Sequence, residues 1–127
     1  MICVVNSVLL ATDSDQLFSL IDSAIASSDL QVYRVKDGAH VIDAVNRVEP
    51  ELVILDLQIG NMGGVACSIS LKQEMSTGRM NNCEVALLLD RDADEYIAGK
   101  SGADAWIIKP LDPMKIKSLV QNISINE

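Results

Sequence analysis

The sequence predicts an α/β fold, a (βα)5 chain whose five strands form one parallel sheet with helices on both faces. Short apolar runs alternate with longer stretches in which apolar residues recur at helical spacing. Three of the apolar runs also lead directly into a charged residue, namely Asp13, Asp56 or Lys109. Since strand–helix–strand crossovers are right-handed, this alternation favours a parallel sheet. The charged residues then fall at its carboxyl edge, where such sheets bind ligands.

Five apolar runs are expected to form the strands. The run over 52–55 is the most continuously hydrophobic, which is typical of a central strand covered on both faces. The run over 30–35 instead alternates, as in a half-buried strand. The expected strands are Val8–Thr12, Leu30–Val35, Leu52–Leu55, Val85–Leu89 and Ala105–Ile108.

The expected helices follow these strands in turn. The first covers about 14–27, and Pro50 ends the second. Gly102 ends the fourth, over 92–101, as a left-handed stop. Asp112 is the expected N-cap of the last helix, with Pro113 in its first turn. The buried stripes are Leu17, Leu20, Ile21, Ala24 and Ile25; Val41, Ile42, Val45 and Val48; Cys67, Leu71 and Met75; and Ile116, Leu119, Val120 and Ile123.

Composition narrows the class of protein. The 127 residues are 49% hydrophobic but only 3% aromatic, which indicates a single domain over residues 1–127 with an aliphatic core. A net charge of −8 argues against direct binding to nucleic acid or to an anionic membrane. Three cysteines without paired spacing, and the lack of a signal peptide or of an apolar stretch long enough to span a bilayer, favour a cytoplasmic protein.

The residues at the strand ends suggest phosphoryl chemistry. Two carboxylates, Asp13 and Asp56, can share Mg²⁺, which often takes one or two carboxylates with water and phosphate oxygens. Lys109 supplies a compact positive charge for a phosphoryl group, and an aspartate in that setting can act as a nucleophile. Simpler roles stay open, because Asp13, Ser14 or Asp15 could cap the following helix and Lys109 alone could be a solvated lysine.

Five motifs in order resemble the receiver domain of bacterial two-component response regulators. The resemblance covers about 7–123 and implies a flavodoxin-like, three-layer fold with strand order 2-1-3-4-5. The motifs are Val8-Leu9-Leu10-Ala11-Thr12-Asp13, Leu52-Val53-Ile54-Leu55-Asp56-Leu57, Met62-Gly63-Gly64, Ser101-Gly102-Ala103-Asp104-Ala105-Trp106 and Ile107-Ile108-Lys109-Pro110-Leu111.

The resemblance implies a role for each matching residue. Asp56 would accept a phosphoryl group from a histidine kinase or phosphotransfer protein, with Lys109 beside it. Asp13, Asp56 and the backbone carbonyl of Gln58 would hold Mg²⁺, and Trp106 would be the aromatic switch of the fifth strand, or would instead pack half-buried against the last helix.

Two positions depart from the family pattern. Thr12 replaces an acid of the metal site, which puts the binding of Mg²⁺ in question. Leu89 stands where receivers carry a serine or threonine, whose hydroxyl bonds the phosphoryl group and draws the following loop inward. The alignment beyond this strand is uncertain by a residue or two, so Asp90 could instead add negative charge near the site.

Three functions are therefore weighed. The first is a response regulator receiver acting in phosphorelay signal transduction, not an enzyme beyond reactions at its own Asp56. It would act on a downstream protein target and could form a homodimer through its fourth helix, fifth strand and fifth helix. The second is a degenerate receiver that binds proteins independently of phosphorylation. The third is a phosphatase of the haloacid dehalogenase type, with Asp13 as nucleophile and Asp15 as general acid. The chain could be a stand-alone receiver or one domain of a longer protein.

Overall fold

The computed structural model describes residues 7–27 and 30–126, and side chains up to residue 121. Its five strands form one parallel sheet in the order β2-β1-β3-β4-β5, which confirms the predicted fold class and strand order. The strands are β1 (Ser7–Ala11), β2 (Gln31–Val35), β3 (Leu52–Asp56), β4 (Glu84–Leu89) and β5 (Ala105–Ile108). The helices are α1 (Asp15–Ile25), α2 (Val41–Val48), α3 (Gly64–Ser76), α4 (Glu95–Lys100) and α5 (Pro113–Asn126), with the 3₁₀ turns η1 (Gly38–His40) and η2 (Asp92–Asp94).

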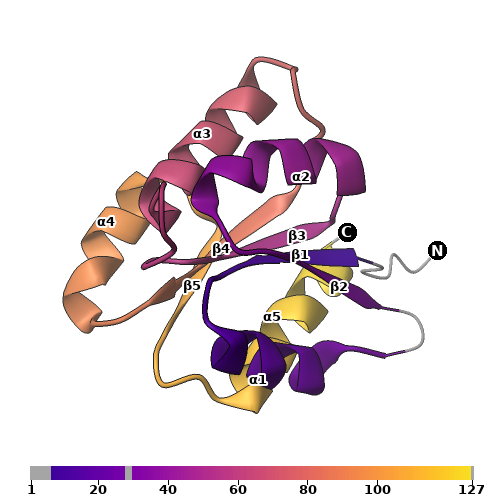
Figure 1. The fold of residues 1–127 in the computed structure, drawn as a ribbon, viewed down its shortest axis with the longest axis vertical. Coiled ribbons are helices and arrows are strands. Elements are labelled where there is room, and N and C mark those ends of the chain that lie inside the picture. The colour runs from indigo at the N-terminus through magenta and orange to yellow at the C-terminus, as the bar shows by residue number, and fades with distance from the viewer. Residues whose placement is uncertain (1–6, 28–29, 127) are drawn as a thin grey trace.

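The helices cover both faces of the sheet, so the protein has three layers (Figure 1). Helices α1 and α5 lie together on one face, and α2, α3 and α4 cover the other. Because successive side chains of a strand point to opposite faces, Val53 and Leu55 of β3 belong to the core beneath α2 and α3, whereas Leu52 and Ile54 belong to the core beneath α1 and α5. All five residues of β3 are buried, as expected of a central strand.

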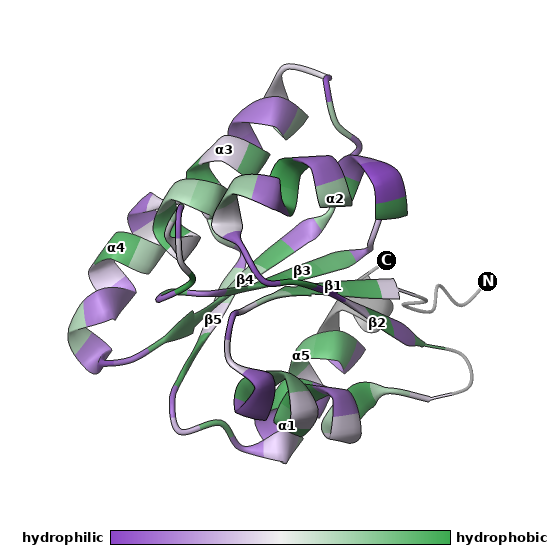
Figure 2. Ribbon diagram, viewed as in Figure 1, coloured by the Kyte–Doolittle hydropathy of each residue, from purple (hydrophilic) through white to green (hydrophobic). Residues whose placement is uncertain are grey.

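Hydropathy follows this layering. The central strands are hydrophobic, and the helices carry their polar residues away from the sheet (Figure 2). In α5, Ile116 is fully buried and Leu119 nearly so, while Val120 is half-buried and Ile123 lies outside the described side chains. Met80 lies in the otherwise polar stretch 76–82, yet it is buried against the α2–α3 core. One apolar residue thus anchors the connection between α3 and β4.

The predicted helix ends are largely confirmed. Ser14 caps α1 by accepting a hydrogen bond from the Leu17 N–H at 3.1 Å, and Asp112 accepts one from the Met114 N–H at the start of α5. Gly102 follows α4 with a φ of 85°, the left-handed stop that favours glycine. The fourth helix differs from its prediction, because it begins as the separate turn η2.

The β3–α3 loop, residues 57–63, is held against its neighbours. Gly38 donates from its N–H to the Gly60 carbonyl at 3.0 Å, and a Cβ on Gly38 would lie 1.8 Å from the Met62 carbonyl oxygen. The Asn61 amide donates to Asp37 Oδ2 at 2.6 Å. Only glycine permits this approach of η1 to the loop, which fixes the backbone that follows Asp56.

Within 7–27 and 30–126, no helix combines the length and apolar character needed to cross a membrane.

Candidate functional site

Polar residues lie at the carboxyl ends of four neighbouring strands. Thr12 follows β1, Asp56 ends β3, Asp90 follows β4 and Lys109 follows β5. The register places Asp56 opposite Leu88, and Leu89 opposite Ile108, so the four residues line one edge of the sheet. The structure therefore brings Asp56 and Lys109 together across β4, although 53 residues separate them in the sequence.

The carboxylate of Asp56 is buried, with only 3% of the residue exposed, and hydrogen-bond donors surround it. The Thr12 hydroxyl donates to Oδ2 at 2.8 Å. Lys109 Nζ donates to Oδ1 at 2.9 Å, and the Gln58 N–H reaches the same oxygen at 3.3 Å. A buried charge is tolerated when it is paired and hydrogen-bonded, and these three donors meet that condition for an ionised Asp56.

Asp90 also belongs to this site, although the sequence alone leaves its role open. Its Oδ1 lies 3.1 Å from Lys109 Nζ, and its Oδ2 accepts a hydrogen bond from the Gln58 side-chain amide at 2.8 Å. Leu89, the position matched to the family hydroxyl, is instead fully buried in the core beneath α2 and α3. The signal for Asp90 was present in the sequence, because it follows its apolar run as Asp13 and Lys109 follow theirs.

These contacts shift the pKa values of Lys109 and Asp90 so that both residues favour their charged forms. Burial opposes the charge of Lys109, but hydrogen bonds and charges from Asp56 and Asp90 outweigh it and raise the pKa of the lysine. The Gln58 amide, together with Lys109, lowers the pKa of Asp90 against a smaller opposing effect of burial. Because one ammonium joins them, the two carboxylate oxygens lie at most about 6 Å apart, where like charges repel by about 3 kcal/mol at an effective dielectric near 20.

Asp13 lies exposed at the rim of the same edge. Its Oδ2 is 3.6 Å from the point where a Cβ on Gly60 would stand, so its carboxylate faces the β3–α3 loop. Ser14, not Asp13, caps α1. Asp15 bonds Arg34 at 2.7 Å and is largely exposed. Of the three residues that could have been the cap, Asp13 is therefore the one left available to a ligand.

This edge of the sheet offers Mg²⁺ only a few protein ligands. In the described part of the chain, no three His, Cys, Asp or Glu side chains gather closely enough to hold a metal by themselves. Mg²⁺ does not need such a cage, since it keeps several waters and uses one or two carboxylates with phosphate oxygens. Asp13, Asp56 and the carbonyl of Gln58 offer oxygen ligands of this kind.

Trp106 lies in β5, away from this cluster. Its indole N–H donates to Glu95 Oε2 of α4 at 3.0 Å, and the half-buried ring packs on the core beneath α2, α3 and α4. The ring is half-buried, as expected, and its hydrogen-bond partner belongs to α4 because position 106 faces that side of the sheet. Packing against the last helix stays a prediction. Whether the ring moves as a switch stays a prediction.

A cleft of about 340 Å³ gives access to Asp56 from solvent. It runs between the start of α1 and the β5–α5 connection, and its rim carries apolar side chains beside the two charged groups. The cleft is lined by Ser14, Gln16, Leu17, Leu20, Asp56, Lys109, Pro110 and Leu111. A macromolecular donor could dock on this rim and reach the carboxylate.

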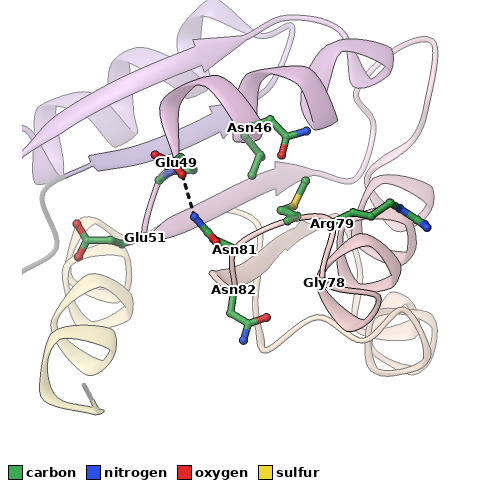
Figure 3. Close-up of a pocket in the computed structure, with 10 residues that line it drawn as sticks. Asn46, Glu49, Glu51, Gly78, Arg79, Asn81 and Asn82 are labelled. Atoms are coloured by element: carbon green, nitrogen blue, oxygen red, sulfur yellow. Dashed lines mark hydrogen bonds between the residues drawn. The ribbon is translucent and has the colours of Figure 1, made fainter.

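A second hollow, of about 380 Å³, lies at the opposite, amino edge of the sheet (Figure 3). There the Asn81 amide donates to Glu49 Oε1 at 2.8 Å, which ties the end of α2 to the α3–β4 connection. Nearby Arg79 is paired with Glu74 at 2.6 Å. These side chains bond one another, so we interpret this hollow as a structural junction.

The structure is thus an α/β fold with a carboxylate–lysine cluster at the carboxyl edge of its parallel sheet. The chain belongs to the response regulator receiver domain family, whose sequence model matches residues 8–121. Curated relatives include the response regulator protein GraR of Staphylococcus epidermidis, 29% identical over 105 residues. Another is the alkaline phosphatase synthesis transcriptional regulatory protein PhoP of Bacillus subtilis, 22% identical over 118 residues.

The alignments cover 81% of this chain and 44% of GraR, and 93% of this chain and 48% of PhoP. The chain therefore spans less than half the length of these curated relatives.

Solved structures agree on the fold. A response regulator of Chloroflexus aurantiacus superposes with a TM-score of 0.84 at 17% identity, covering 94% of this chain and 98% of that one. The receiver domain of a histidine kinase from Syntrophus aciditrophicus gives 0.82 at 22% identity, covering 95% and 91%. These structural neighbours therefore support the receiver fold of the chain.

Proposed function

We propose that Asp56 is the phosphoacceptor of this receiver domain and takes its phosphoryl group from a histidine kinase or phosphotransfer protein. The observation that carries the proposal is the buried Asp56 carboxylate, which contacts Lys109 Nζ at 2.9 Å and lines a cleft. In the step, a carboxylate oxygen of Asp56 bonds to phosphorus while the bond from phosphorus to the donor histidine nitrogen breaks. The electron pair of that bond stays on the imidazole nitrogen, and an acyl phosphate forms on Asp56.

The neighbouring groups support this step by position and charge. Lys109 is placed to offset negative charge on the phosphoryl oxygens. The Thr12 hydroxyl holds one carboxylate oxygen and so orients the other toward the donor. Bound Mg²⁺ would neutralise charge on the phosphoryl group, and Asp13, Asp56 and the Gln58 carbonyl would hold it. Because Asp56 is only 3% exposed, water reaches its carboxylate through the cleft alone.

We also propose that the α4–β5–α5 face contacts a downstream protein or a second copy of the chain. Tyr96 and Ile97 of α4 and Met114 of α5 are exposed by 75%, 46% and 65%, which leaves apolar surface on both helices of this face. A hollow of about 560 Å³ between these helices includes Trp106. This function would place the domain in the cytoplasm, with no turnover of a free substrate.

Phosphoryl transfer from a small donor tests the proposal. The protein is incubated with Mg²⁺ and acetyl phosphate, and the adduct is measured by intact mass and located by peptide mapping. We expect one phosphoryl group, on Asp56, which disappears in Asp56→Asn. As a matched control, Asp43→Asn removes an exposed carboxylate from α2 and should leave the adduct unchanged. An adduct that survives in Asp56→Asn would overturn the assignment.

The two alternatives receive less support. A haloacid-dehalogenase-type phosphatase would need Asp15 as general acid, but Asp15 is paired with Arg34 and lies 84% exposed. A degenerate receiver would have no use for a buried aspartate in contact with a lysine, yet the Asp56–Lys109 pair is intact. Phosphomonoester hydrolysis that is lost in Asp13→Asn would restore the phosphatase hypothesis.

A further inference from the structure

Lys109 is shared between two carboxylates. Its Nζ lies 2.9 Å from Asp56 Oδ1 and 3.1 Å from Asp90 Oδ1. The lysine side chain is only 26% exposed, so water competes weakly for the ammonium. Asp90 is itself fixed, because the Gln58 amide donates to its other oxygen at 2.8 Å. The unphosphorylated domain therefore already provides Lys109 with an internal anion besides Asp56.

A phosphoryl group on Asp56 would change this balance. It brings more negative charge than the carboxylate alone and spreads that charge over several oxygens. It would thus attract Lys109 more strongly and repel the Asp90 carboxylate at the same time. The side chain of a serine or threonine at the end of β4 would donate to those oxygens, whereas an ionised aspartate has no proton to donate.

We propose that Asp90 is a positioning residue that holds Lys109 before phosphorylation, and that phosphoryl capture at Asp56 has to displace Asp90 from Lys109. This inference rests on the proposed function of Asp56. Because Asp90 begins the connection from β4 to η2 and also bonds Gln58, its displacement pushes this connection outward. That direction is opposite to the inward movement that a hydroxyl at this strand end would produce.

The charge of Asp90 can be removed with little change of shape. Asp90→Asn keeps an acceptor for the Gln58 amide but loses the ion pair, and Asp90→Glu keeps the charge. Asp92→Asn is the matched control, since it removes an exposed carboxylate two residues further along. Each variant is incubated with Mg²⁺ and acetyl phosphate, and the rate of adduct formation on Asp56 is followed by intact mass. Circular dichroism checks that each variant is folded.

We expect Asp90→Asn to take up the phosphoryl group about tenfold faster than the parent chain. Asp90→Glu, which keeps the charge, should be labelled more slowly than Asp90→Asn, and the control Asp92→Asn should stay near the parental rate. A second readout needs no metal: acylation of Lys109 by an amine-reactive reagent, measured by peptide mapping, should become faster in Asp90→Asn alone. Without the Asp90 ion pair, Lys109 Nζ keeps only one of its two carboxylate partners and is freer to reach the reagent.

The outcomes separate this inference from the proposed function. Equal or slower labelling of Asp56 in Asp90→Asn, with the parent chain labelled normally, would overturn the role of Asp90 and leave Asp56 as the phosphoacceptor. Labelling that appears in Asp90→Asn but not in the parent chain would support the inference in its strongest form. If neither protein is labelled, the proposed function fails and this inference fails with it.

Discussion

The hydroxyl of Thr12 donates a hydrogen bond of 2.8 Å to Oδ2 of Asp56, and both residues are buried. Thr12 stands where receivers carry an acid, so a donor here takes the place of a negative charge. The same hydroxyl oxygen also accepts from the Ser14 N–H at 3.1 Å, which links Asp56 to the cap of α1. The contact therefore compensates the buried carboxylate in the absence of a metal.

Removing this hydroxyl should destabilise the protein. Thr12→Val has nearly the same shape but leaves Oδ2 of Asp56 without that donor, and an unsatisfied buried polar group costs about 1–3 kcal/mol. Urea unfolding should show this loss in the free energy of unfolding. Thr77→Val, which removes an exposed hydroxyl bonded to a helix carbonyl, is the control and should change stability by less than about 0.5 kcal/mol. Equal costs at both positions would contradict the assigned role of Thr12.

Restoring the family acid should make the protein depend on metal. Thr12→Asp places a second carboxylate against Asp56, so without metal the like charges should lower the melting temperature. Mg²⁺ should then raise it more steeply than in the parent chain, because a ligand at 100 times its dissociation constant adds about 2.7 kcal/mol. The double variant Thr12→Asp, Asp13→Asn should lose most of this Mg²⁺ response. An unchanged response in the double variant would show that Asp13 is not a ligand.

Two substitutions can decide whether residue 89 or residue 90, at the end of β4, faces Asp56 and Lys109. Leu89→Thr exchanges a fully buried core side chain for a smaller one with a hydroxyl, which should cost about 2–4 kcal/mol. It should not speed phosphoryl capture. Asp90→Thr instead places a hydroxyl within the cluster around Lys109 and should speed labelling by acetyl phosphate at little cost in stability. Faster labelling in Leu89→Thr would place the functional position at residue 89.

The sequence was sufficient for the fold and for one contact of the site. Continuous apolar runs and helical stripes predict the order of elements, and the charged residues at strand ends predict that Asp56 and Lys109 meet, because parallel strands share one carboxyl edge. The role of Asp90 could not be settled this way. A shift of one residue at a strand end changes which side chain faces the site, and the sequence pattern does not fix that register at the end of β4.

The partner of Trp106 was missed for a different reason. Alternation along β5 shows that the side chains of neighbouring residues face opposite layers, but nothing in a four-residue strand says which layer each one faces. The hydrogen bond from Trp106 to Glu95 settles this through a contact between distant elements. The hydrogen bond from the Gly38 N–H to the Gly60 carbonyl also joins segments that are far apart in the sequence, so the local sequence pattern could not reveal it.

The stability of the protein in acid should depend on Asp90. Its folded-state pKa is lowered, first by the Gln58 amide and then by Lys109, below the ordinary value of 3.8. The stability that these contacts contribute is therefore fully present above about pH 4 and is lost as the pH falls through the folded-state pKa. Asp90→Asn should show a shallower loss of stability as the pH falls below the ordinary value of 3.8. Asp92→Asn should follow the parent curve, and an equally shallow curve in that control would show that the slope does not report on Asp90.

Two alanine substitutions should change stability in opposite directions. A Cβ on Gly64, at the start of α3, would lie 2.7 Å from the Asp56 carbonyl oxygen and 3.0 Å from Leu57 Cα, which are backbone atoms that cannot simply turn away. Gly64→Ala should therefore cost about 1–3 kcal/mol and slow phosphoryl capture, because the clash moves the backbone of Asp56. Gly99 is exposed within α4, and its Cβ would meet only Trp106, at an ordinary 3.7 Å.

Gly99→Ala should accordingly stabilise the protein by about 0.5–1 kcal/mol, the usual gain in a helix interior. Its rate of labelling by acetyl phosphate should stay near that of the parent chain. Urea unfolding and intact mass measure both effects on the same samples. If Gly64→Ala were as stable and as quickly labelled as the parent, the close packing of α3 on the phosphoacceptor strand would not control the position of Asp56.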